Sequence, residues 1–117
     1  MFVEFAVNDV YDGVNGADSQ RYMENIIRTI YSYAPKAGIV MVFITNSGLK
    51  GAEFEQLIAQ RELAEAYGIP CINVGKALCD EMSTYLDMSL IDANSPEWLK
   101  FFTDTVHPTD AGYEKYA

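Results

Sequence analysis

The 117-residue sequence predicts an α/β fold in which helices cover a small parallel sheet. Three short runs rich in apolar and β-branched residues are typical of strands that are buried on both faces. These runs alternate with amphipathic helical patterns, and such alternation favours parallel strands because each return to a parallel strand needs a crossover connection. We expect the order β-α-β-α-β-α-α, with about three strands.

The strands are expected at Met1 to Val7, Gly38 to Thr45 and Ile69 to Val74. The first run is apolar except for Glu4. The second is nearly continuous in valine, isoleucine, methionine and phenylalanine, and the third is shorter. Apolar runs of this length suit strands of a covered sheet.

The first helix is expected to follow the first strand. From Tyr22 to Tyr33, apolar residues recur every three or four positions and so form one face of a helix. Asp18 or Ser19 can cap its start, and Pro35 ends it.

Three further helices are marked by their ends. Residues 54–67 carry a second helical pattern, and Gly68 suits the left-handed turn that closes a helix. Ser95 before Pro96 is typical of a helix start, so a short helix with a buried Trp98 is expected there. A last helix begins after Pro108.

The bulk composition indicates one domain without nucleic-acid or membrane partners. The chain is short enough for a single core. Its formal net charge of −9, from 17 acidic and 8 basic residues, repels phosphate backbones and anionic lipid. No apolar run reaches the roughly 20 residues of a membrane span.

Neither the cysteines nor the aspartates predict a metal site. Cys71 and Cys79 have the wrong spacing for a metal signature, and the only histidine lies far from them. If Asp12 held the fifth position of a calcium loop, Val10 would occupy the third, where an oxygen ligand is needed.

Polar residues at the carboxyl ends of the strands are the first candidates for a site, because ligands of open α/β sheets bind there. Asn8 and Asp9 follow the first expected strand, Asn46 and Ser47 follow the second, and a loop after Val74 follows the third. We expect these positions on one rim of the sheet.

The second candidate is the segment around His107, the sole histidine. Asp104 stands three residues earlier, and Pro108 stiffens the turn before the last helix. This spacing can place a carboxylate beside the imidazole, an arrangement suited to a general base that is oriented by an acid.

Both candidates match known sequence blocks. Residues 5–9 (FAVND) resemble the Gly-x-Asn-Asp block of the SGNH, or GDSL-like, ester hydrolases, with Ala6 in place of the glycine. Residues 104–112 (DTVHPTDAG) resemble that family's Asp-x-x-His-Pro block and the helix start after it. The order and separation of the two blocks match as well, so the resemblance covers essentially the whole chain.

The resemblance implies a function and a site. In this family His107 would be the general base, Asp104 would orient it, and Asn8 would donate a hydrogen bond to the oxyanion, while Asp9 fixes local structure. The implied fold is a flavodoxin-like three-layer α/β/α sandwich, and the implied reaction is hydrolysis of a small ester without metal or organic cofactor. Acetylated carbohydrates are one implied substrate class.

The family's nucleophilic serine is not present, since no Gly-Asp-Ser occurs in the sequence. We therefore expect residues 1–117 to be a single partial domain, a fragment of the hydrolase that is inactive alone. Ser47 is the alternative nucleophile, although a strand-end serine before glycine is usually a turn residue. The missing neighbour predicts self-association through the strand edge from Met1 to Val7.

Two functions of other classes stay open. The chain can be a non-catalytic binding or structural module of flavodoxin-like fold, in which His107 is a relic. It can also be an unrelated flavodoxin-like domain such as an acidic receiver module, although the strand-end lysine of that class is not visible in the sequence.

Overall fold

A computed structural model describes all 117 residues, which divide into two compact units. The first unit comprises Met1–Phe43 and Glu53–Ile72, and the second comprises Ile44–Ala52 and Asn73–Ala117. Each unit is described by itself below. The expectation of one domain stays a prediction.

The strands β1 (Phe2–Val3), β2 (Val40–Phe43) and β3 (Cys71–Asn73) form one sheet in the order β1-β2-β3. β1 runs parallel to β2, with Val3 opposite Met41. The α/β class with a three-stranded parallel sheet is therefore confirmed, and the sequential strand order follows from helical crossovers between neighbouring strands.

The first expected strand, from Met1 to Val7, is wrong beyond its first residues. β1 ends at Val3, and helix α1 (Ala6–Tyr11) begins three residues later. The Glu4 carboxylate accepts a hydrogen bond from the Val7 N–H at 3.3 Å and so satisfies one of the free donors at the helix start. Short apolar runs suit a buried helical turn as well as a strand.

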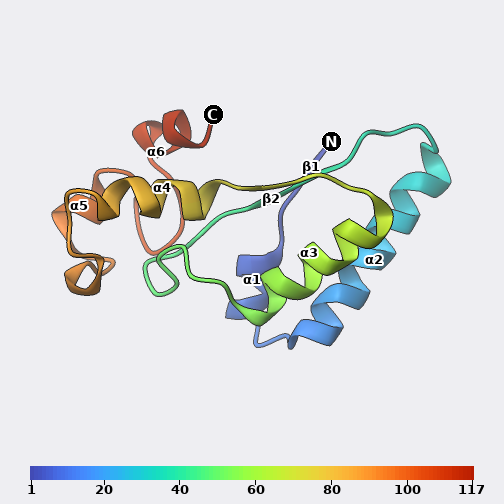
Figure 1. The fold of residues 1–117 in the computed structure, drawn as a ribbon, viewed down its shortest axis with the longest axis horizontal. Helices are drawn as coiled ribbons and strands as arrows, with labels where there is room; N and C mark the ends of the chain where they lie inside the picture. The colour runs from blue at the N-terminus through green and yellow to red at the C-terminus, as the bar shows by residue number, and fades with distance from the viewer. The chain divides into compact units, whose positions relative to one another are not determined.

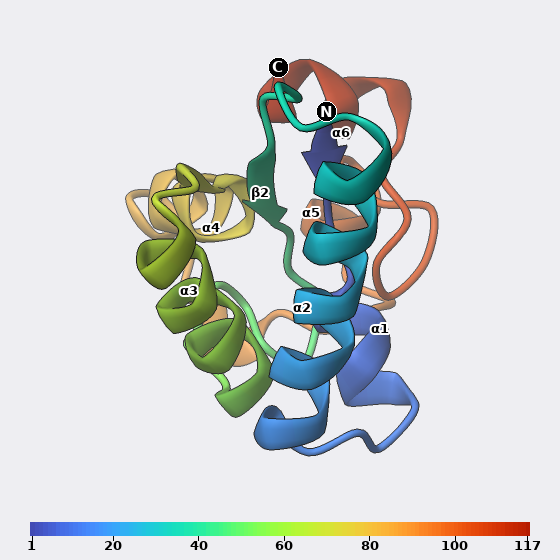
Figure 2. The ribbon, with the colours of Figure 1, turned by 90° about the vertical axis from the view of Figure 1, so that its right-hand side faces the viewer.

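The crossover helices of the first unit are α2 (Gly16–Tyr33) and α3 (Glu55–Tyr67), which lie side by side in both ribbon views (Figures 1 and 2). The cap of α2 lies earlier than expected. Asn15, rather than Asp18 or Ser19, is the N-cap, and its side chain accepts the Asp18 N–H at 2.9 Å. The helix therefore gains about one turn at its start.

The core of the first unit forms between the sheet and these helices. Gly68 closes α3 with φ 65°, as the sequence predicted. The largest buried apolar side chains come from one face of α2, from alternate positions of β2 and from α3: Met23, Ile27, Met41, Phe43, Leu57 and Leu63. Alternation in β2 matches a strand that presents one face to this core.

The second unit contains α4 (Val74–Ser83), a short 3₁₀ helix η1 (Met88–Leu90), α5 (Pro96–Leu99) and α6 (Asp110–Tyr116). The expected loop after the third strand is wrong, because α4 begins there directly. Asn73 caps it by accepting the Lys76 N–H at 2.8 Å.

The core of the second unit is built around an aromatic pair. The rings of Trp98 and Phe102 are fully buried and stack with centroids 4.0 Å apart and planes 8° apart. Leu78, Met82, Ile91 and Phe101 complete the cluster. The burial expected for Trp98 is confirmed. None of the helices in either unit has the length and apolar character that a membrane span requires.

Candidate active site

Asp104 and His107 form a direct side-chain contact. Asp104 Oδ2 lies 2.8 Å from His107 Nδ1, within the hydrogen-bond reach that the sequence spacing predicted. The His107 side chain is 75% exposed and that of Asp104 is 50% exposed. The imidazole therefore faces solvent while one of its nitrogens is held.

The second oxygen of Asp104 organises the same loop. Asp104 Oδ1 accepts the backbone N–H groups of Val106 at 2.8 Å and His107 at 2.9 Å. The pKa of Asp104 is lowered to about 2 by these contacts. The hydrogen bond from the His107 N–H has the largest effect, followed by that from the Val106 N–H and by the contact with the His107 ring. An ionised carboxylate accepts hydrogen bonds only, so it favours the imidazole tautomer that is protonated on Nδ1. The Nε2 atom is then free to accept a proton.

Neighbouring elements hold the backbone of this loop. The buried indole of Trp98 donates its Nε1–H to the Asp104 carbonyl at 2.7 Å. Ser47 donates its backbone N–H to the Thr105 carbonyl at 2.9 Å. The exposed loop is therefore tied both to the aromatic core and to the turn that follows β2.

The start of α6 explains the residues after His107. The Thr109 hydroxyl accepts the Gly112 N–H at 3.2 Å and caps the helix. Any Cβ at Gly112 would lie 2.0 Å from the Phe101 carbonyl oxygen, so only glycine fits this close approach. The Thr-x-x-Gly spacing thus docks α6 directly behind the loop that carries His107.

Side-chain hydrogen bonds hold the turn after β2. The buried Asn46 accepts the N–H groups of Gly48 and Leu49 on its Oδ1 atom, at 2.9 and 2.8 Å. Thr45 Oγ1 accepts the Gly51 N–H at 2.8 Å. Asn46 therefore has a structural role in this turn, as asparagine commonly does, and Ser47 contacts the Asp104–His107 loop through its backbone.

Asn8 lies on α1 in the first unit, with its side chain exposed. The next residue, Asp9, anchors the helix. Asp9 Oδ2 accepts hydrogen bonds from Ser19 Oγ on α2 at 2.5 Å and from Gln60 Nε2 on α3 at 3.1 Å. Asp9 thus fixes the element that carries Asn8, which is the local role expected for it.

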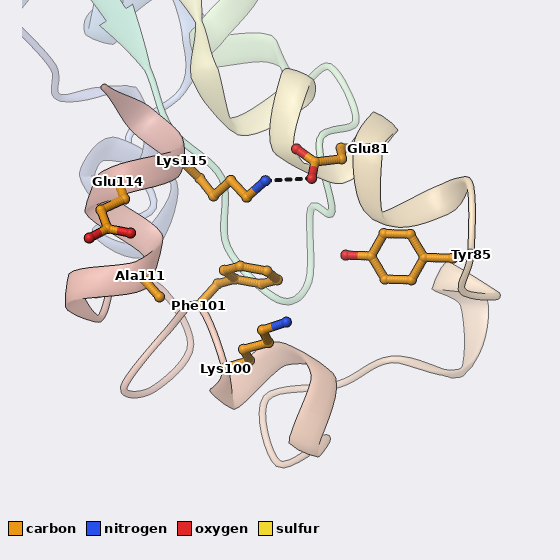
Figure 3. A pocket seen from close by; sticks show the side chains of 7 residues that line it. All are labelled: Glu81, Tyr85, Lys100, Phe101, Ala111, Glu114 and Lys115. Carbon is orange, nitrogen blue, oxygen red and sulfur yellow. Dashed lines mark hydrogen bonds and ion pairs between the residues drawn. The ribbon is translucent and has the colours of Figure 1, made fainter.

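One surface groove of the second unit does not include the Asp104–His107 pair. It has a volume of about 480 Å³, and two of its lining residues, Lys115 and Glu81, form an ion pair with Nζ and Oε1 2.5 Å apart (Figure 3). Its lining consists of Glu81, Tyr85, Lys100, Phe101, Ala111, Glu114 and Lys115. The Asp104–His107 pair therefore lies on an open loop, outside this groove.

The thiols are poor candidates for a nucleophile. Cys71 and Cys79 are both free, and Cys79 is buried. Burial raises the pKa of Cys79 to about 11, so this thiol is protonated at neutral pH. Burial also raises the pKa of Cys71. No group of three or more His, Cys, Asp or Glu side chains is arranged to hold a metal ion.

The sequence predicted the contact between Asp104 and His107 but not the contact between Trp98 and Asp104. A tryptophan six residues before an aspartate carries no local signal for an indole-to-carbonyl hydrogen bond. Only the fold of α5 and the turn after it brings the two together.

The sequence matches the GDSL-like Lipase/Acylhydrolase family over residues 1–115. Neither a curated protein nor a solved structure matches it. The family match spans nearly the whole chain and includes both blocks, around Asn8 and around His107. The chain therefore belongs to the GDSL-like lipase/acylhydrolase family.

Proposed function

We propose that this chain carries the acid–base pair and an oxyanion donor of a serine ester hydrolase. His107 is the general base, Asp104 orients it, and Asn8 donates its side-chain amide to the oxyanion. The observation that supports the proposal most is the 2.8 Å contact between Asp104 Oδ2 and His107 Nδ1 beside an exposed imidazole. A base held on one nitrogen and open on the other suits acyl transfer.

The proposed reaction proceeds through an acyl-serine. The serine hydroxyl attacks the ester carbonyl while its proton passes to His107 Nε2. The bond from the carbonyl carbon to the leaving oxygen then breaks, and His107 returns the proton to the departing alcohol. Water repeats the sequence, releasing the acid and the free serine.

The role of Asn8 is proposed from its match to the family block and its exposed position on α1. A preorganised side-chain donor stabilises the negative charge that develops on the carbonyl oxygen. The loss of one such donor typically costs about 3 kcal/mol, or a factor of about 100 to 1,000 in kcat. Asp9 supports this role by fixing α1 to α2 and α3.

The nucleophile of the proposed reaction is not among these 117 residues, because they contain no Gly-Asp-Ser sequence. We propose that the chain alone is inactive. For the complete site we propose small esters as substrates, with acetylated carbohydrates as the first class to test.

The test is reconstitution of the site by fusion. A Gly-Asp-Ser segment from an active family member is joined before Met1, and hydrolysis of p-nitrophenyl acetate and of an acetylated xylan oligosaccharide is measured. We expect turnover that falls by several orders of magnitude in His107→Ala and by about 100-fold or more in Asn8→Ala.

A matched control separates the site from general damage. Asp110→Asn changes an exposed carboxyl group close to His107 in sequence that has no proposed catalytic role, and it should leave turnover near that of the parent fusion. An active fusion with unchanged turnover in His107→Ala would refute the proposal and favour a relic histidine in a binding module.

A further inference from the structure

We infer that Trp98 is the positioning residue of the Asp104–His107 pair, an inference that rests on the proposed function. Its indole Nε1–H donates to the Asp104 carbonyl oxygen at 2.7 Å. Trp98 does not touch the imidazole. It acts through the backbone of Asp104, whose side chain in turn holds His107.

The loop needs such an anchor because burial does not hold it. Thr103, Asp104, Thr105 and His107 are all exposed. The carboxylate of Asp104 can receive the Val106 and His107 N–H groups only while the backbone at residue 104 keeps its present direction. Hydrogen bonds in an exposed loop compete with water and contribute little by themselves.

The indole, in contrast, is held by the packing of the core. Trp98 is fully buried, and its ring stacks on the fully buried Phe102 at 4.0 Å between centroids. A buried indole N–H needs a partner, and its only chemistry is donation. The Asp104 carbonyl meets this need, so the position of Asp104 is set by the aromatic core of the unit.

Two other backbone contacts fix the rest of the loop, but neither of them involves residue 104. Ser47 N–H donates to the Thr105 carbonyl at 2.9 Å, and Thr103 N–H donates to the His107 carbonyl at 2.7 Å. The Trp98 contact is therefore the one that connects the orienting carboxylate to a rigid element. Its loss should loosen Asp104 more than it loosens the chain around it.

The experiment measures the titration of the Asp104 carboxyl carbon by NMR in the 117-residue chain and in Trp98→Phe. The pKa of Asp104, about 2 in the parent chain, depends on the Val106 and His107 N–H bonds and on the ring contact. We expect a rise of about 0.5 or more on the pH scale in Trp98→Phe, toward the ordinary value for aspartate, because these bonds form for less of the time.

Two controls separate positioning from general destabilisation. Phe102→Leu weakens the aromatic stack but keeps the indole donor, so it should lower thermal stability without moving the Asp104 titration. Asp87, whose pKa is lowered by the Ser89 hydroxyl and N–H, is an internal reference that should not move in either variant.

Three results would overturn the inference. These are a folded Trp98→Phe chain with an unchanged Asp104 titration, an equal shift in Phe102→Leu, or an equal shift of Asp87. If Trp98→Phe does not fold, benzothienylalanine at position 98 keeps the shape of the ring and replaces only the N–H with sulfur, and the same titration decides. Because the titration needs no substrate, its outcome is independent of whether the fused site hydrolyses esters.

Discussion

Replacement of Glu4 with glutamine should stabilise the chain at alkaline pH. Glu4 follows β1, its side chain is partly buried, and its carboxylate accepts the Val7 N–H at the start of α1. Burial, and to a smaller extent the charge of Asp9, raises the pKa of Glu4 from 4.5 to about 7, against the opposing effect of the backbone hydrogen bonds. Glutamine keeps the acceptor and removes the charge.

The direction in which stability changes with pH follows from proton binding. The folded state holds the Glu4 proton more tightly than the unfolded state does, so this stability is fully present below pH 4.5 and is lost as the pH rises through 7. The full shift corresponds to about 3 kcal/mol. We expect the parent chain to lose about 1 to 2 kcal/mol of this stability between pH 5 and pH 8. The loss is smaller than the full shift because part of it occurs below pH 5 and because the side chain keeps some contact with water.

The assay is urea unfolding followed by far-ultraviolet circular dichroism at pH 5 and pH 8. Glu4→Gln should lose less stability between these two pH values than the parent chain does. Glu62→Gln removes the same charge from an exposed position of α3 and should behave like the parent. Equal pH dependence of Glu4→Gln and the parent chain would refute the argument from burial.

Three further predictions concern catalysis, packing and association. The chain alone should hydrolyse p-nitrophenyl acetate far more slowly than an enzyme with a complete triad does, and Ser47→Ala should not change the rate. Fast turnover that this substitution abolishes would instead make Ser47 the nucleophile. Gly112→Ala should destabilise the chain by about 2 kcal/mol or more in urea unfolding, since its Cβ would lie 2.0 Å from the Phe101 carbonyl oxygen, whereas Gly38→Ala, with open space around it, should change stability little. We also propose that the exposed edge of β1 pairs with a second copy, because Phe2 is 74% exposed on an edge strand. Light scattering should show association that Phe2→Lys abolishes. A parent chain that stays strictly monomeric at high concentration would contradict this proposal.

The elements that the sequence predicted well are those with a strong local signal. β2 is a continuous run of β-branched and large apolar residues, and it is a strand. α3 ends at a glycine with positive φ, and α5 begins with a serine before a proline. In each case the local conformational preference of the residues agrees with the conformation that they have in the fold.

The elements that could not be predicted from the sequence depend on contacts between residues or on apolar patterns that suit both a strand and a helix. Ala6 and Val7 continue an apolar run, but in the structure they begin α1, where the Glu4 carboxylate accepts the Val7 N–H. The start of α4 was missed because Val74 ends an apolar strand pattern, while Asn73 before it acts as the cap. Short apolar runs do not distinguish strand from helix.

The candidate site divides in the same way. The contact of Asp104 with His107 is local, since three residues separate them in a turn, and the spacing predicted it. The contacts of Trp98 with Asp104 and of Ser47 with Thr105 depend on how α5 and the turn after β2 pack. Those contacts are not encoded in any short segment, so a single sequence could not reveal them.

The most direct test of the central claim is a double-mutant cycle on Asp104 and His107 in the fused hydrolase. If Asp104 acts only by orienting His107, Asp104→Ala should lower kcat strongly in the parent fusion but cause almost no further loss in His107→Ala. That non-additive result is the one predicted. Independent, additive losses, or full activity without His107, would contradict the assignment of these two residues as one catalytic unit.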